Sequence, residues 1–138
     1  MISVLGSGND KTYPFIYMAK VLDTIVEFTG GQLLFNYIPI QINDAKSILN
    51  LCSKETQKHV YFDISGKDLR DFMAISSHCD ALIGNEGGAV NMAKALDIPT
   101  FAIYSPWIDK ATWNIFEKDG KNKSVHLKDF KPELYANK

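Results

Sequence analysis

The sequence predicts an α/β domain, a Rossmann-like, doubly wound parallel sheet of about five strands with helices on both faces. Short apolar runs alternate with helical segments of about 10–15 residues, which is the pattern of repeated strand–helix–strand units. Two of the apolar runs end in polar, glycine-rich turns, which are typical of ligand-binding loops in this class of fold. No internal repeat or low-complexity tract interrupts the alternation.

The expected elements follow the apolar pattern along the chain. Thr12 is expected to cap the first helix, with Pro14 in its first turn and Gly30 at its end. Residues 118–138 are expected to form a C-terminal loop and tail, with residues 125–127 held against the body. Strands are expected at residues 2–5, 33–38, 59–62, 81–83 and 100–104. Further helices are expected at residues 43–52, 68–78 and 88–97.

Size and composition indicate one soluble domain over residues 1–138. The chain is 46% hydrophobic and carries a formal net charge of −1. A chain of this length buries about two-thirds of its unfolded surface, which is enough for a core of its own. The near-neutral charge provides no strong field for nucleic acid, so nucleic acid is not an expected partner. No apolar run approaches the ~20 residues that span a bilayer.

The two cysteines and the start of the chain indicate a cytoplasmic protein. Cys52 and Cys79 lie far apart without metal-type spacing, so both are expected to be reduced, partly buried thiols. Met1 leads directly into an apolar strand, with no basic stretch of the kind that begins a signal peptide.

Topology predicts where a ligand binds. Right-handed crossovers and the usual doubly wound order place the first strand beside the fourth. Ligands bind outside the carboxyl ends of the strands where the strand order reverses. The loops expected to meet there are residues 6–11 and 84–88, the most polar and glycine-rich turns of the chain.

The first loop carries groups suited to a diphosphate. Gly6, Ser7 and Gly8 allow the backbone to approach a ligand closely, Ser7 adds a hydroxyl, and Lys11 adds a cation. A solvated loop lysine with no ligand is the structural alternative for Lys11.

The second loop joins a buried strand to a helix N-terminus, where unpaired N–H groups form a ready anion site. Its spacing matches neither the G-x-G-x-x-G motif nor a P-loop. Gly87 and Gly88 can serve tight packing or a positive φ as well as a ligand. Glu86 can be a helix-start carboxylate that only the helix dipole stabilises.

Residues 80–105, D-A-L-I-G-N-E-G-G-A-V-N-M-A-K-A-L-D-I-P-T-F-A-I-Y-S, resemble the donor-site signature of a glycosyltransferase family. That family includes the ADP-heptose:lipopolysaccharide heptosyltransferases. Its strand ends in small-x-Asp-Thr/Gly-Gly, a His follows three residues later, and an Ala-rich helix leads to a Pro and a strand. Glu86 stands at the acidic position, Gly87 and Gly88 at the turn, and Asn91 at the position of the His. Asn91 keeps hydrogen bonding and lacks the ionisable ring.

The resemblance extends to the first loop and implies a role for each residue. Lys11-Thr12-Tyr13-Pro14 matches the family's Lys, any residue, aromatic and Pro. The match implies that Lys11 binds a phosphate of a nucleotide-sugar donor, with help from Ser7. Gln41 is the nearest polar residue to a family Glu that holds the ribose, and residues 65–67 align with a segment along the base. Because two close anions repel each other, Glu86 is assigned to sugar hydroxyls.

The resemblance covers residues from Ile2 to about Trp107 and implies one half of a two-domain GT-B enzyme. The implied function is donor binding in an inverting glycosyltransferase of lipopolysaccharide or glycan biosynthesis. The implied partners are a nucleotide-sugar donor, a missing N-terminal acceptor domain and a lipid-linked glycan acceptor. The whole enzyme would then work in the cytoplasm, peripherally at the inner membrane face. No convincing catalytic base and no cofactor is expected in this chain, and without an Asp-x-Asp motif or metal-type cluster the site is expected to be metal-independent.

Other classes of function remain open. The domain can be a non-catalytic nucleotide- or phosphate-binding module, which would bind ADP without discriminating among sugars. A phosphoacceptor domain needs acidic residues after the first strand, where this chain has Leu5-Gly6-Ser7-Gly8, and a flavodoxin-like domain needs more aromatic loop residues.

The remaining notable side chains are assigned structural roles. His59 and His126 are expected to be structural, and Trp107 and Trp113 to anchor the C-terminal segment. Neighbouring side chains diverge, so residues 78–80 (His-Cys-Asp) are not a catalytic trio.

Overall fold

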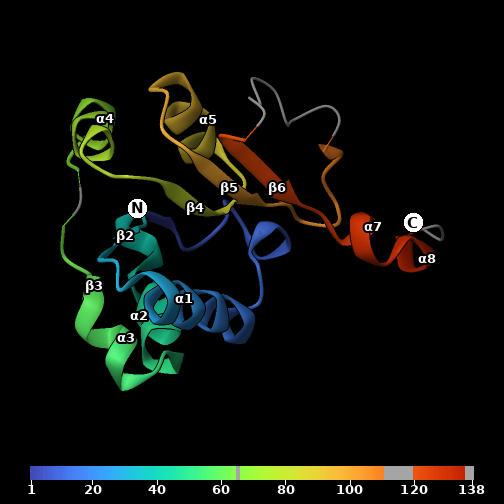
Figure 1. Ribbon diagram of the computed structural model, residues 1–138, viewed down its shortest axis with the longest axis horizontal. Helices are drawn as coiled ribbons and strands as arrows, with labels where there is room; N and C mark the ends of the chain where they lie inside the picture. Colours follow the sequence, from blue (N-terminus) through green and yellow to red (C-terminus); the bar gives the residue numbers. More distant parts are fainter. Residues whose placement is uncertain (65, 111–119, 136–138) are drawn as a thin grey trace.

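The computed structural model describes residues 1–64, 66–110 and 120–135. They form a six-stranded, all-parallel sheet in the order β3-β2-β1-β4-β5-β6. Helices α1 to α3 lie on one side of the sheet, and α4 and α5 lie on the other (Figure 1). The strands are β1 Ile2–Ser3, β2 Leu33–Asn36, β3 Val60–Tyr61, β4 Leu82–Asn85, β5 Thr100–Ile103 and β6 Asn122–Val125. The predicted doubly wound α/β fold is confirmed, and the five expected strands lie within two residues of their expected bounds.

Helix α1, Phe15–Thr29, shows how the sequence builds these layers. Its buried residues are Met18, Ala19, Leu22 and Val26, whose helical spacing points one stripe at the sheet. Gly30 ends the helix in a left-handed conformation with φ 64°, which glycine adopts without strain. The other helical segments are η1 Asn9–Lys11, η2 Pro39–Gln41, α2 Ile42–Leu51, α3 Lys54–His59, α4 Leu69–Ser77, α5 Gly88–Ala95, α7 Leu127–Phe130 and α8 Pro132–Tyr135.

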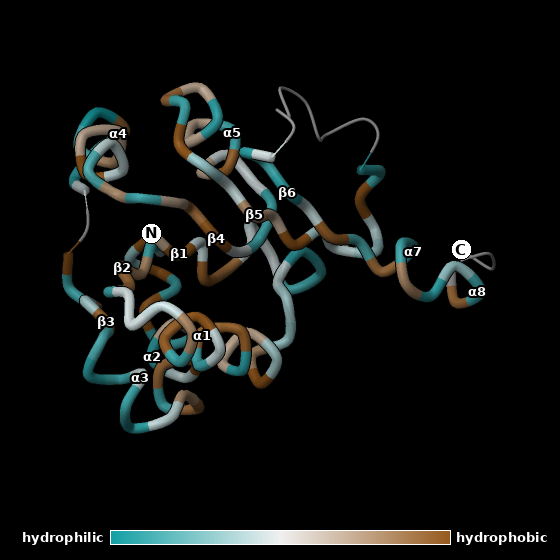
Figure 2. The backbone as a smooth tube through the Cα atoms, viewed as in Figure 1, coloured by the Kyte–Doolittle hydropathy of each residue, from teal (hydrophilic) through white to brown (hydrophobic). Residues whose placement is uncertain are grey.

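Two apolar clusters pack on opposite sides of the sheet. One joins β1 and β2 to α1 and α2, and the other joins β4 and β5 to α5. Hydrophobic colour follows β4 and parts of α1, while α3 is hydrophilic along its length (Figure 2). The first cluster contains Ile2, Val4, Met18, Ala19, Leu22, Val26, Leu33, Phe35, Ala45, Ile48, Cys52 and Ile103. The second contains Leu82, Val90, Ala93, Ile98, Ala102 and Tyr104.

The expected cap at Thr12 is wrong. Helix α1 begins at Phe15 behind Pro14, and no side chain caps it. Thr12 instead closes the first loop, because its hydroxyl accepts from the Gly6 N–H at 3.0 Å and donates to the Gly8 carbonyl at 2.7 Å.

The expectation of a loop over the start of the C-terminal segment is also wrong. Asn122–Val125 form β6, which pairs with β5 in parallel register. Asn122 is buried, and its Nδ2 donates to Thr100 Oγ1 at 2.9 Å, so a polar pair holds this edge of the sheet. His126 is buried against the body as expected, with Nε2 3.0 Å from the Ile108 carbonyl. Trp113 lies outside the described residues.

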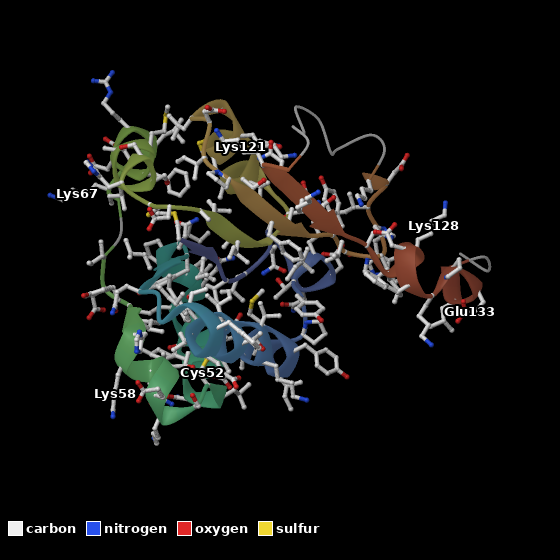
Figure 3. All side chains as sticks on the ribbon, in the orientation of Figure 1. Cys52, Lys58, Lys67, Lys121, Lys128 and Glu133 are labelled. Atoms are coloured by element: carbon white, nitrogen blue, oxygen red, sulfur yellow. The ribbon has the colours of Figure 1, made fainter. Side chains whose placement is uncertain are left out.

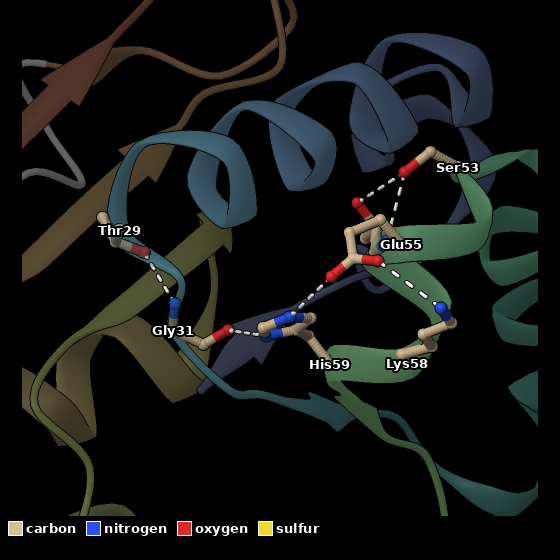
Figure 4. Close-up of polar contacts among 7 residues, drawn as sticks. Thr29, Gly31, Ser53, Glu55, Lys58 and His59 are labelled. Carbon is tan, nitrogen blue, oxygen red and sulfur yellow. Dashed lines mark hydrogen bonds and ion pairs between the residues drawn. The ribbon is translucent and has the colours of Figure 1, made fainter.

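His59 has a structural role, as expected, and it belongs to α3 rather than to the strand. Its Nδ1 lies 3.1 Å from the Gly31 carbonyl oxygen and its Nε2 lies 3.4 Å from Glu55 Oε1. Dashed lines mark both contacts in Figure 4. Ser53 caps α3 by accepting from the Thr56 N–H at 3.1 Å. The contact with Gly31 joins α3 to the segment directly before β2.

Both cysteines are free, as expected. Cys52 is buried among the helices, whereas Lys58, Lys67 and Lys128 extend outward at the periphery (Figure 3). Burial, with a smaller contribution from the negative charge of Asp23, raises the pKa of Cys52 to about 12. This thiol is therefore protonated and unreactive at neutral pH.

Candidate functional site

The two glycine-rich loops meet where the strand order reverses. β1 pairs with β2 on one side and with β4 on the other, so the prediction that the first strand lies beside the fourth is confirmed. The loop after β1 and the turn after β4 therefore leave the sheet at the same edge. A direct bond joins them, because the Tyr13 N–H donates to Asn85 Oδ1 at 2.7 Å.

Side chains from three other strand ends hold the first loop in place. Gln41, after β2, donates through Nε2 to the Gly6 carbonyl at 3.0 Å. Ser105, after β5, donates to the Asp10 carbonyl at 2.6 Å. Asn85, at the end of β4, binds the Tyr13 N–H. The loop thus has fixed contacts at its entrance, in η1 and at its exit.

The predicted ligand groups of this loop face solvent. Ser7 and Lys11 are exposed, and Gly8 is half-buried. Within the described residues, the backbone N–H groups of Ser7 and Gly8 make no hydrogen bond. Gly6 serves the loop itself, because a Cβ there would lie 2.1 Å from the Lys11 carbonyl oxygen. The loop therefore offers a cation, a hydroxyl and free N–H donors.

In the second loop, Gly84 has a structural role, whereas Gly87 and Gly88 have free space where a Cβ would lie. Gly84 adopts φ +138°, and a Cβ there would lie 2.2 Å from the Ser3 carbonyl oxygen, so only glycine fits beside β1. A Cβ on Gly87 or Gly88 would meet nothing within 4 Å, and neither has a left-handed φ. Close packing therefore does not require glycine at Gly87 or Gly88, and the space beside each is open.

The N-terminus of α5 leaves donors free beside that space. Gly87 precedes the helix, and no side chain caps it. The N–H groups of Gly87 and Gly88 make no hydrogen bond within the described chain. Because helix N-termini carry partial positive charge, this position favours an anion.

The charges of Glu86 and Lys11 interact across the two loops. Burial raises the pKa of the half-buried Glu86 carboxyl, while the nearby positive charges of Lys11 and Lys94 lower it in part. The Glu86 N–H donates to the Ile103 carbonyl at 2.9 Å, which fixes its backbone at the ends of β4 and β5. The site thus combines a cation with a carboxylate suited to accepting hydrogen bonds from hydroxyls.

The other two predicted site residues lie close by. Asn91 is half-buried in the first turn of α5, where its N–H donates to the Gly87 carbonyl at 3.3 Å. Its side-chain amide makes no hydrogen bond to a described residue. Gln41 contacts the first loop, but both ends of its amide bond backbone groups, the Gly6 carbonyl and the Ile38 N–H. Ser65 of the turn expected along the base lies outside the described residues.

Sequence reasoning placed the turn of residues 104–107 at the border of the site, and it missed the anchoring roles of Asn85 and Ser105. Both are buried and line a cavity of about 60 Å³ between the first loop and the ends of β4 and β5. The available signal was an Asn ending a buried strand directly before a glycine-rich turn. A polar residue at that position needs buried partners, and here the partners are backbone groups of other segments.

Two features of the described residues concern metals and membranes. No group of three or more His, Cys, Asp or Glu side chains in this part of the chain could hold a metal ion. None of its helices has the length and apolar character needed to cross a membrane.

Comparison with known proteins identifies a similar fold. No protein-family model and no curated protein matches the sequence. Among solved structures, the chain is similar to E. coli ADP-heptose LPS heptosyltransferase II, with a TM-score of 0.73 and 18% sequence identity. The match covers 90% of this chain and 36% of that chain, so this chain spans about a third of the neighbour's length. At this identity the match establishes a shared fold, and the chain has the Rossmann-like α/β architecture of one part of that protein.

Proposed function

We propose that this domain binds a nucleoside diphosphate sugar as the donor half of a glycosyltransferase. The observation that carries the proposal is the meeting of two ligand loops at the reversal of strand order. The positive charge of Lys11 acts on Glu86 across the two loops, and the N–H groups of Ser7, Gly8, Gly87 and Gly88 make no hydrogen bond within the described residues. The neighbour of similar fold is an ADP-heptose heptosyltransferase, which favours a donor of that kind.

Each group has a role in this proposal. Lys11, Ser7 and Gly8 bind the diphosphate, together with the N–H groups of Gly87 and Gly88. Glu86 and Asn91 bind sugar hydroxyls, for which a carboxylate and an amide are suitable partners. Gln41 stays a predicted ribose contact, although its bond to Gly6 equally supports a role in holding the loop.

The proposed reaction is displacement at the anomeric carbon with inversion. An acceptor hydroxyl oxygen forms the new bond to that carbon, and the bond to the diphosphate oxygen breaks with its electron pair. Lys11 and the free N–H groups stabilise the charge that develops on the leaving diphosphate. A base within hydrogen-bond reach of the acceptor proton is also required, and we assign none to this chain.

The rest of the enzyme is part of the proposal. A second, N-terminal domain supplies the acceptor site and the base, and the acceptor is a lipid-linked glycan of lipopolysaccharide or glycan biosynthesis. The reaction proceeds without a metal ion, at the cytoplasmic face of the membrane. The isolated domain therefore binds donor weakly and transfers no sugar at a useful rate.

The second candidate is a non-catalytic nucleotide-binding module of the same fold. The cation of Lys11 and the free N–H groups of Gly87 and Gly88 suit any bound phosphate, with or without a sugar, and this observation favours it. Competition between ADP and ADP-sugars for the domain distinguishes the two. A donor domain binds one ADP-sugar more tightly than ADP, and the loss of that difference in Glu86→Gln supports the sugar contact. Equal affinity for ADP and every ADP-sugar tested would favour the module.

A further inference from the structure

Asn85 connects three segments that lie far apart in the sequence. Its side chain is 1% exposed at the carboxyl end of β4. Its Oδ1 accepts from the Tyr13 N–H at 2.7 Å, and its Nδ2 donates to the Ser3 carbonyl at 3.0 Å. One amide therefore joins the end of β1, the end of β4 and the exit of the first loop.

This bond fixes the part of the loop that carries the cation. Lys11 lies between Asp10, whose carbonyl Ser105 holds, and Tyr13, whose N–H Asn85 holds. Asn85 is also followed directly by Glu86 and Gly87, so it is the residue through which the two loops share one anchor.

Such an anchor has a consequence for binding beyond stability. A glycine-rich loop that is free to move loses conformational entropy when a ligand orders it. A loop already held in its bound arrangement loses less, so the ligand binds more tightly without any new contact.

We infer that Asn85 is a positioning residue of the donor site, which holds Lys11 and the first loop against the Gly87–Gly88 turn. This inference rests on the proposed function. Asn85 itself is buried and acts through the Tyr13 backbone rather than through the ligand.

The variant Asn85→Asp tests the inference because its hydrogen-bonding pattern depends on pH. A neutral carboxyl has the shape of the amide, and it accepts from the Tyr13 N–H and donates to the Ser3 carbonyl. A carboxylate has no donor and faces the Ser3 oxygen with a negative charge. Burial raises the pKa of the introduced carboxyl, so the neutral form persists above the range of an exposed aspartate. The titratable groups of the cavity, Asp10, Tyr13 and Tyr104, and those of the two loops, Lys11 and Glu86, are the same in both proteins.

The experiment is calorimetric titration with ADP at pH 5.5 and pH 8, with each Kd divided by the wild-type value at the same pH. Dividing by the wild-type Kd cancels the effect of pH on ADP itself and on the charged groups that both proteins share. We expect a ratio within about threefold of one at pH 5.5 and a loss of about tenfold or more at pH 8, equivalent to ~1.4 kcal/mol. A ratio near one at both pH values, with the variant folded by circular dichroism, overturns the inference.

Two further variants serve as a control and as a substitute for Asn85→Asp. Ser53→Ala removes the cap of α3, away from the site. It is expected to lower Tm and to leave the Kd for ADP equal to the wild-type value. If Asn85→Asp is unfolded at pH 8, Asn85→Ser decides, because its hydroxyl is too short to bridge both groups. An ADP affinity about tenfold weaker at both pH values supports the inference, and unchanged affinity overturns it. If the wild-type domain binds UDP or GDP in place of ADP, that nucleotide is the probe. If it binds none of the three, the proposed function fails and the inference fails with it.

Discussion

Replacing Gly88 with alanine separates a ligand role from a structural one. A Cβ at this position meets no atom within 4 Å, and Gly88 is the first residue of α5. Alanine in a helix is more stable than glycine by up to about 1 kcal/mol. For a domain of this size, that gain corresponds to a rise in Tm of about 3–5 °C.

The same methyl group reduces ligand binding if the open space holds a phosphate. It would occupy the space beside the free N–H groups of Gly87 and Gly88, so we expect ADP affinity to fall about tenfold, or ~1.4 kcal/mol. Thermal unfolding and calorimetric titration of Gly88→Ala measure the two effects on one protein. Unchanged ADP affinity would refute the assignment of this space to the ligand, and a lower Tm would refute the open-space geometry.

Three other changes test the structural reasoning. Gly84→Ala places a Cβ 2.2 Å from the Ser3 oxygen at φ +138°, so we expect a loss of more than about 2 kcal/mol of unfolding free energy in urea; a smaller loss contradicts the close packing of β4 on β1. Burial raises the pKa of Glu86, so the folded state binds this proton more tightly than the unfolded state does. The protonated carboxyl therefore stabilises the fold at low pH, and this stabilisation is lost as the pH rises above the ordinary pKa of 4.5. Glu86→Gln should therefore have a higher free energy of unfolding than wild type at pH 7 and about the same value at pH 3.5. A higher value at pH 3.5 alone would contradict the raised pKa. Ser53→Ala removes the bond to the Thr56 N–H and should cost about 1 kcal/mol without weakening ADP binding, whereas a loss of ADP affinity would contradict its use as a control.

The pairing of the first strand with the fourth and the meeting of the two loops could be predicted because their signals are local. Apolar runs, helical periodicity and the stop at Gly30 lie within single segments. The rules of right-handed connection then place the loops 6–11 and 84–88 at the same edge of the sheet.

The elements that sequence reasoning missed are stabilised by polar contacts. β6 has Asn122 bonded to Thr100 in place of an apolar pattern. Helix α3, with the sequence K-E-T-Q-K-H, has no apolar stripe and depends on the Ser53 cap. Apolar periodicity carries no information about either element.

The roles of Thr12 and Asn85 depend on geometry between distant segments. A Thr before a Pro is a common helix-cap signal, yet here its hydroxyl closes the Gly6–Gly8 turn. Asn85 binds Ser3 and Tyr13, residues more than 70 positions away, which only the folded sheet brings together.

Titration of the purified domain with ADP, UDP and GDP by calorimetry, with Lys11→Ala in parallel, tests the central claim most directly. Donor binding predicts saturable binding of one of the three nucleotides. It also predicts a loss of about 10- to 100-fold in Lys11→Ala, the range of one charge-assisted hydrogen bond of ~1.5–3 kcal/mol. Failure of all three nucleotides to bind, or equal binding by Lys11→Ala, would contradict a donor site built around Lys11.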